Sequence, residues 1–241
     1  MTCDIFIRSY RKDLGWLELC LAAVAKFCRG FRAVVVVVPR ASERWLRRLP
    51  PLAPNVRVEI CPDYADDYLG QQLTKLQADH FTDADFVCHV DSDCIFTQPV
   101  SPDDLLDAGR PRIVMRSYAS LDRHWPWQAP TEAFLGWKVT HDFMQRPPFV
   151  FPRWIYAEFR AHARSQHGMD LEQYILSRPP RAFSEFNALG AFAHARHTQS
   201  FSWELVGDER TADSTCRWYW SWGGLDDGTR TEIEALLQSD V

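Results

Sequence analysis

Short apolar runs alternate with amphipathic stretches along the first 91 residues of the chain. The run 33–38 (AVVVVV) is apolar at every position, which is typical of a strand buried on both faces of a parallel sheet. The expected strands are 3–7, 33–38, 56–60 and 85–91. The amphipathic stretches predict helices over 14–28, with Asp13 as N-cap, over 42–49 and over 70–81. This alternation predicts a Rossmann-like α/β domain, with a mostly parallel central sheet flanked by helices.

The pattern is less regular after residue 91. A further strand is expected over 111–117, whereas residues 118–150 are rich in Trp, Pro and His and show little periodicity. The remaining expectations are a helix over 151–167, a shorter one over 170–177, a brief strand turning into a helix over 182–196, an aromatic loop or flap, and a final helix. No linker or repeat interrupts the chain, so 1–241 is expected to form one domain. Residues 1–117 would bind a cofactor-like ligand, and 118–241 would shape a substrate site and a C-terminal flap.

Charge and cysteine content narrow the function classes. The formal charge of −5 disfavours a broad nucleic-acid surface, and seven cysteines without CxxC spacing indicate neither a disulfide framework nor a zinc cluster. The N-terminus MTCDIFIRSY lacks the features of a signal peptide, and the longest apolar block is too short for a membrane span. We expect a cytoplasmic protein, with a membrane-peripheral location as the alternative.

Polar residues follow two of the expected strands where each ends. Arg8, Ser9 and Tyr10 follow the first strand, and Asp91 and Asp93 (the DSD motif, 91–93) end the fourth. Open parallel sheets bind ligands beyond the carboxyl ends of their strands. The segment after the first strand has no glycine before Gly15, which excludes a glycine-rich phosphate loop. A Mn²⁺ or Mg²⁺ ion held by the DSD motif would neutralise phosphates instead; the alternative is a solvated turn.

The chain resembles the metal-dependent nucleotide-sugar glycosyltransferases of the GT-A fold, which contain a DxD motif, and in particular a poorly characterised bacterial and phage branch. The resemblance covers most of residues 3–200 and rests on the segments IFIRSYRKD, YLGQQLTKLQAD, DSD, THDFMQRPPF and FSEFNALGAF. It implies that residues 1–117 bind a nucleoside diphosphate sugar, with uridine as the commonest base, and that 118–241 bind the acceptor.

The resemblance also implies roles for individual residues. Asp93 would ligate the metal, and Asp91 would share the metal or contact the sugar or ribose. The residues expected around the donor are Arg8, Ser9, Tyr10, Asp13, Gln71, Gln72, Lys75 and Asp91. For Lys75 the structural alternative is a solvent-facing lysine. Related folds often add a late histidine to the metal, and His197 or His194 could supply it.

Inverting transfer needs a base that deprotonates the acceptor hydroxyl. Glu185 is the first candidate because it opens a helix, where the helix dipole favours a carboxylate. Asp142 is the second candidate, and the structural alternative for Glu185 is a capping glutamate. If transfer retains configuration, Glu185 would only orient the acceptor.

Other functions remain open at this stage. A nucleotidyltransferase shares the same metal–phosphate chemistry, and a non-catalytic nucleotide- or sugar-binding module would use the DSD motif as a turn. The acceptor could be a glycan, a lipid-linked sugar, a small molecule or, less readily, a hydroxymethylated DNA base. Arginines within 40–48 could form a basic face toward DNA or a membrane, although such clusters are more often a solvated helix surface.

Overall fold

The structure is a computed structural model that describes residues 1–121, 127–206 and 215–239. Its central sheet has the strand order β3-β2-β1-β4-β9. Strands β1 (Cys3–Arg8), β2 (Val34–Pro39), β3 (Val56–Cys61) and β4 (Phe86–Asp91) are parallel, and β9 (Phe149–Pro152) joins antiparallel to β4. The prediction of an α/β fold with a mostly parallel sheet is therefore confirmed. The chain reverses its strand order between β1 and β4.

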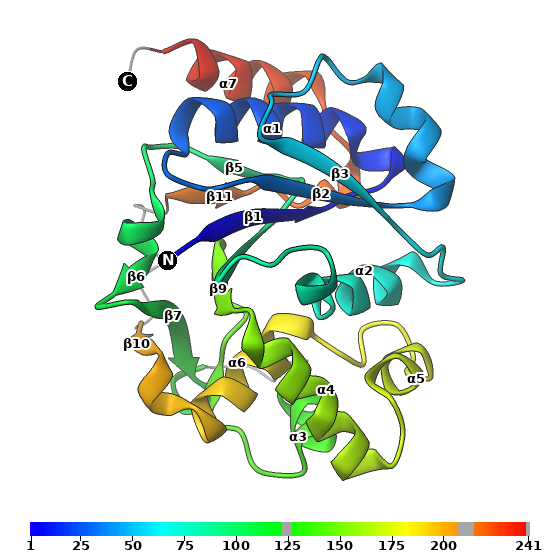
Figure 1. The fold of residues 1–241 in the computed structure, drawn as a ribbon, viewed down its shortest axis with the longest axis vertical. Coiled ribbons are helices and arrows are strands. Elements are labelled where there is room, and N and C mark those ends of the chain that lie inside the picture. The colour runs from blue at the N-terminus through cyan, green and yellow to red at the C-terminus, as the bar shows by residue number, and fades with distance from the viewer. Residues whose placement is uncertain (122–126, 207–214, 240–241) are drawn as a thin grey trace.

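Helices cover both faces of this sheet (Figure 1). Helices α1 (Leu14–Phe27) and α7 (Asp227–Gln238) pack on one face, around a core that includes Ile5, Val36 and Cys88. The other face carries α2 (Asp67–Lys75), α3 (Gln128–Leu135), α4 (Trp154–His167), α5 (Leu171–Leu176) and α6 (Glu185–Arg196). The strand side chains alternate between the two cores, so β1 and β2 are buried on both faces, as their continuous apolar sequence predicts.

Smaller elements complete the fold. A second sheet has the order β10-β7-β6, formed by β10 (Ser202–Leu205), β7 (Arg110–Ser117) and β6 (Leu106–Asp107), and β8 (His141–Asp142) pairs with β7. Strand β11 (Cys216–Trp218) pairs with β5 (Cys94–Phe96). The 3₁₀ helices are η1 (Arg11–Asp13), η2 (Arg40–Arg48), η3 (Ala78–His80), η4 (Pro102–Leu105), η5 (Tyr118–Ser120), η6 (Thr198–Ser200) and η7 (Ser221–Gly223).

Several predicted boundaries are wrong for local reasons. The expected helix 70–81 is divided because Gln77 leaves helical backbone angles, so α2 ends at Lys75 and η3 follows. The expected helix from residue 151 starts at Trp154, because 149–152 extend the central sheet as β9. No strand forms at 182–184. Asp13 precedes α1 but accepts no capping hydrogen bond, and the helix expected at 42–49 is the 3₁₀ helix η2.

The seven cysteines are free thiols, of which six are buried and Cys28 is half-buried. Over the residues described, every helix is too short or too polar to span a bilayer. That the whole chain forms one domain stays a prediction, although β9 from its second half pairs directly with β4 from the first.

Candidate functional site

The DSD motif lies at the carboxyl ends of β1 and β4, where the strand order of the sheet reverses. Arg8 ends β1 and is the register partner of Asp91, which ends β4. Because neighbouring parallel strands lie about 5 Å apart, their terminal side chains share one edge of the sheet. This is the position at which doubly wound sheets bind ligands, and the structure brings the predicted residues Arg8, Asp91 and Asp93 together there.

Carboxylates are concentrated at this edge. Burial raises the pKa of Asp13 to about 7, and the negative charges of Asp93 and Asp91 add to the shift. Burial also raises the pKa of Asp93, followed by repulsion from Asp91. The charge of Asp67, at the start of α2, also raises the pKa of Asp13, whereas the charge of Arg8 lowers it. Acids this close disfavour one another's ionisation, and a cation placed among them would relieve the repulsion.

We predict that Asp13 makes stability in the absence of metal depend on pH. Its folded-state pKa of about 7 lies above the ordinary value of 3.8. Between these values the folded protein binds more protons than the unfolded protein, so the free energy of unfolding falls as pH rises. Urea denaturation with chelator should show wild type gaining stability relative to Asp13→Asn as pH is lowered from about 7 to about 5.

Asp104→Asn is the control for this pH dependence. Hydrogen bonds from Ser101 lower the pKa of Asp104, so its contribution to stability changes only at more acidic pH. In this variant the free energy of unfolding should change with pH as it does in wild type between pH about 5 and about 7. If the free energy of unfolding of Asp13→Asn changed with pH as steeply as that of wild type, the described environment of Asp13 would be contradicted.

A basic residue balances one side of the carboxylate cluster. Arg8 is buried and forms a two-pronged ion pair with Asp67, in which Nη1 donates to Oδ2 over 3.1 Å. Asp66 fixes the position of Asp67, because its carboxylate caps α2 by accepting from the N–H groups of Tyr68 and Leu69. Asp67 is not among the site residues predicted from the sequence. In the sequence, Asp66 and Asp67 indicate the start of a helix. They do not indicate that Asp67 pairs with Arg8 on β1.

Lys75 joins the DSD motif to the candidate base. Its ammonium lies 2.6 Å from Asp91 Oδ1 and 2.9 Å from Glu185 Oε1. Burial by itself would lower the pKa of Lys75, but the charges of Asp91 and Glu185 outweigh burial and raise it. Lys75 is 3% exposed, so the solvent-facing alternative is wrong. Glu185, at the first turn of α6, is 4% exposed. One buried ammonium thus holds two carboxylates from segments far apart in the chain.

Three of the residues expected around the donor keep buried polar atoms without a partner among the described residues. These atoms are Arg8 Nε, Ser9 Oγ and Gln72 Oε1. Buried polar groups in proteins are nearly always paired, so a cluster of unpaired ones indicates a place where a ligand or water supplies the partner. Tyr10 and Gln71 are half-buried beside them in sequence.

The C-terminal segment covers the DSD motif. Ser221 N–H donates to Asp93 Oδ2 over 2.7 Å, and Tyr219 N–H donates to the Asp93 carbonyl over 3.0 Å. The rings of Trp218 and Trp220 stack with centroids 4.3 Å apart. Trp218 is half-buried against the core, whereas Trp220 and Trp222 are exposed. The sequence predicts an aromatic loop or flap here, and the structure places this segment against Asp93 itself.

Asp142 lies near the candidate base without contacting it. It is buried on β8, and burial raises its pKa. The N–H of the next residue, Phe143, donates to Asn187, two residues after Glu185 in α6. Asp142 is therefore placed beside the first turn of α6, but its own carboxylate accepts from Met144 N–H.

The structure does not bring His197 to the DSD motif. His197 follows the last residue of α6, while Glu185 is the first, so roughly 18 Å of helix separates them. Its Nε2 lies 2.7 Å from Glu158, and its ring contacts Trp154. His194 packs against His141, Phe143 and Trp203. Geometry therefore gives no support to either histidine as a metal ligand.

The residues at the DSD motif fit a hard cation that shares its coordination with a ligand. Within residues 1–121, 127–206 and 215–239, no group of three or more His, Cys, Asp or Glu side chains is arranged to hold a metal by itself. Mg²⁺ is commonly held by one or two carboxylates, with phosphate oxygens and water completing its shell. Asp91 and Asp93 can supply those carboxylates.

Comparison with protein families places most of the chain within a family model. The family described as "Family of unknown function (DUF6492)" matches residues 5–219. The chain belongs to this family. The matched region begins in β1 and reaches Tyr219, so it contains the DSD motif, Lys75 and Glu185. No curated protein matches the chain.

Proposed function

We propose that this protein is a metal-dependent glycosyltransferase of GT-A type, which transfers a sugar from a nucleoside diphosphate sugar to an acceptor hydroxyl. The observation that carries the proposal is the carboxylate cluster at the β1–β4 edge, joined through buried Lys75 to Glu185. Donor-binding and acceptor-activating groups would need this proximity, because the transferred carbon is bonded to the leaving phosphate and attacked by the acceptor.

The donor would lie across the carboxyl ends of β1 and β4. Asp93 and Asp91 would hold Mn²⁺ or Mg²⁺, and such an ion stabilises the negative charge that develops on a diphosphate leaving group. Arg8, Ser9 and Gln72 would use their unpartnered polar atoms to bind the nucleotide or sugar. UDP is the first nucleotide to test, because uridine is the commonest choice in the family that the sequence resembles.

Glu185 would accept the proton of the acceptor hydroxyl in an inverting transfer. Its carboxylate is oriented by Lys75 Nζ and is almost completely buried, so its position relative to the donor site is fixed. Lys75 would act as a positioning residue that contacts Asp91 and Glu185 at once. Closure of the Trp220–Trp222 segment over the site would limit transfer to water.

The proposal predicts metal-dependent stabilisation by a nucleotide. A nucleoside diphosphate at about a hundred times its Kd, with Mn²⁺, should raise Tm by roughly 5–10 °C. Asp93→Asn should remove this increase, while its amide oxygen still accepts the Ser221 N–H. The measurement is a thermal-shift panel of nucleoside diphosphates, each with Mn²⁺ and with chelator.

The matched control is Asp103→Asn, which removes an exposed carboxylate outside the site. It should keep the full nucleotide-dependent increase. If no nucleotide stabilises wild type, or if Asp93→Asn responds as wild type does, the DSD motif is a structural turn and the proposal fails. Release of pyrophosphate from a nucleoside triphosphate, in place of diphosphate from a sugar nucleotide, would identify a nucleotidyltransferase.

A further inference from the structure

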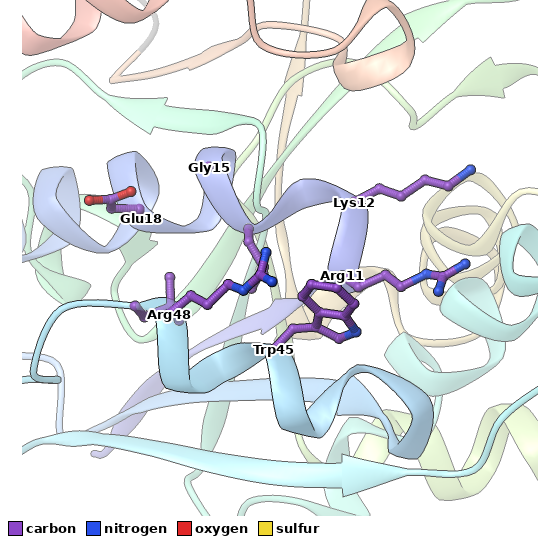
Figure 2. A pocket seen from close by; sticks show the side chains of 8 residues that line it. Arg11, Lys12, Gly15, Glu18, Trp45 and Arg48 are labelled. Carbon is purple, nitrogen blue, oxygen red and sulfur yellow. The ribbon is translucent and has the colours of Figure 1, made fainter.

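A second candidate surface lies beside η1 and η2, outside the site built on the DSD motif. It contains a hollow of about 490 Å³ whose lining includes Arg11, Lys12, Trp45 and Arg48 (Figure 2). A neighbouring hollow of about 660 Å³ is lined by η2 residues that include Arg40, Arg44 and Arg47. The N–H of Arg11 donates to Ser42 Oγ over 3.0 Å, which ties the two 3₁₀ helices together. We call this surface the η1–η2 face.

The η1–η2 face is strongly basic, although the chain is acidic. Its two helices contain six basic residues against two acids, Asp13 and Glu43, whereas the whole chain has a formal charge of −5. All six basic side chains are exposed: Arg11, Lys12, Arg40, Arg44, Arg47 and Arg48. In the part of the chain that the structure describes, none of the six forms an ion pair, although Glu18 also lines the first hollow.

Several basic residues elsewhere in the described part of the protein form ion pairs, unlike the six of this face. Arg32 pairs with Asp4, Arg160 with Asp79 and Arg217 with Glu232. On the η1–η2 face the guanidinium groups of Arg44 and Arg48 instead lie 5.4 Å and 4.1 Å from the Trp45 ring. Unpaired cations held close together repel one another, and an anionic partner would remove that repulsion.

An uncharged apolar loop continues from the basic helix. Residues 50–54 (PPLAP) are all exposed and carry no charge, and Leu52 is 37% exposed. Basic side chains beside an exposed apolar segment are the two components of peripheral binding to an anionic bilayer. The cations attract the headgroups, and the apolar residues enter the interface.

We propose that the η1–η2 face docks on the surface of an anionic lipid membrane. Nine residues of 3₁₀ helix extend over about 18 Å, so the cations are spread over several headgroups. A site for one free phosphate would instead gather its cations around a single buried point. The proposal does not depend on the glycosyltransferase function, although η1 contributes both Lys12 to this face and Asp13 to the carboxylate cluster.

Vesicle co-sedimentation of the full chain tests the proposal. Wild type should sediment with vesicles that contain phosphatidylglycerol, remain in solution with phosphatidylcholine alone, and be released by high salt. Each basic residue near such a surface contributes about a fivefold factor in partitioning, so Arg40→Gln/Arg44→Gln/Arg47→Gln should weaken binding by about a hundredfold. Thermal unfolding of each variant checks that the fold is intact.

The matched control is Arg112→Gln/Arg153→Gln/Arg196→Gln, which removes the same charge from exposed positions in β7, just before α4 and at the end of α6. Vesicle binding of this control should weaken by less than threefold. Leu52→Ser should weaken vesicle binding but leave retention on heparin unchanged. Three results would overturn the proposal: no wild-type binding to anionic vesicles, equal losses in the two triple variants, or release by inorganic phosphate at constant ionic strength. The last result would assign the face to a free phosphate compound.

Discussion

Lys75→Met is expected to lower the free energy of unfolding by about 3–5 kcal/mol, because it leaves Asp91 and Glu185 without their shared cation. For a chain of this length that loss corresponds to a decrease in Tm of roughly 6–20 °C. Methionine keeps most of the volume of the lysine stem, so the change reports mainly on charge. Urea and thermal denaturation at neutral pH, with chelator present, would measure it.

Two variants separate charge from packing in this experiment. Adding Glu185→Gln and Asp91→Asn to Lys75→Met removes the unpaired carboxylates and should restore part of the lost stability. Lys138→Met breaks the ion pair with Glu132, in which the lysine side chain is 90% exposed. It should lower the free energy of unfolding by no more than about 1 kcal/mol. Equal effects at Lys75 and Lys138 would show that Lys75 does not hold a buried ion pair.

Glu185→Gln is expected to reduce the rate of sugar transfer by about 10²–10⁴-fold, because glutamine cannot accept the acceptor's proton. Stabilisation by nucleotide and Mn²⁺ should remain, since the DSD motif is unchanged. Before the acceptor is identified, the rate can be followed as release of nucleoside diphosphate with water as the acceptor. A loss of rate without a loss of nucleotide binding separates proton transfer from donor binding.

Asp142→Asn is the comparison for Glu185→Gln. Asp142 is buried close to the start of α6, but no contact joins its carboxylate to Lys75 or Asp91 in the part of the chain described. We expect a smaller loss of rate, about tenfold or less. If Asp142→Asn caused the larger loss, Asp142 would be the base. If neither variant changed the rate, the transfer would proceed without a protein base, as a retaining mechanism allows.

The first half of the fold could be predicted because its signals are local. Strands β1, β2 and β4 are short and mostly apolar, β3 alternates apolar and charged residues, and α1 shows helical spacing of its apolar residues. Helix α3 and strand β9 were missed in a stretch rich in Trp, Pro and aromatic residues. Strand β9 has only four residues, all buried, and its place in the sheet depends on pairing with β4. Such a segment carries no alternation that would separate it from the helix that follows.

The site was predictable only in part, because some of its contacts join segments that are far apart in the sequence. The DSD motif and Arg8 end strands, and adjacency of strand ends follows from a parallel sheet. The contact between Lys75 and Glu185 spans 110 positions, and the hydrogen bond from Ser221 to Asp93 spans 128. Neither has a sequence pattern, because both depend on how the C-terminal half folds back on the sheet. His197 was proposed because related folds often add a late histidine to the metal, whereas the length of α6 places it far from Glu185.

The hydrogen bond between Ser221 and Asp93 has a consequence for synthesis of the chain. Strands β1 to β4 can pair once residue 91 has left the ribosome, but the carboxylate at their edge acquires its backbone donor only after residue 221 has followed. Until then β5, which forms a separate two-stranded sheet with β11, has an unpaired edge. Stalled or truncated chains that end before residue 216 would expose this edge to other chains, so aggregation is the expected fate of incomplete translation products.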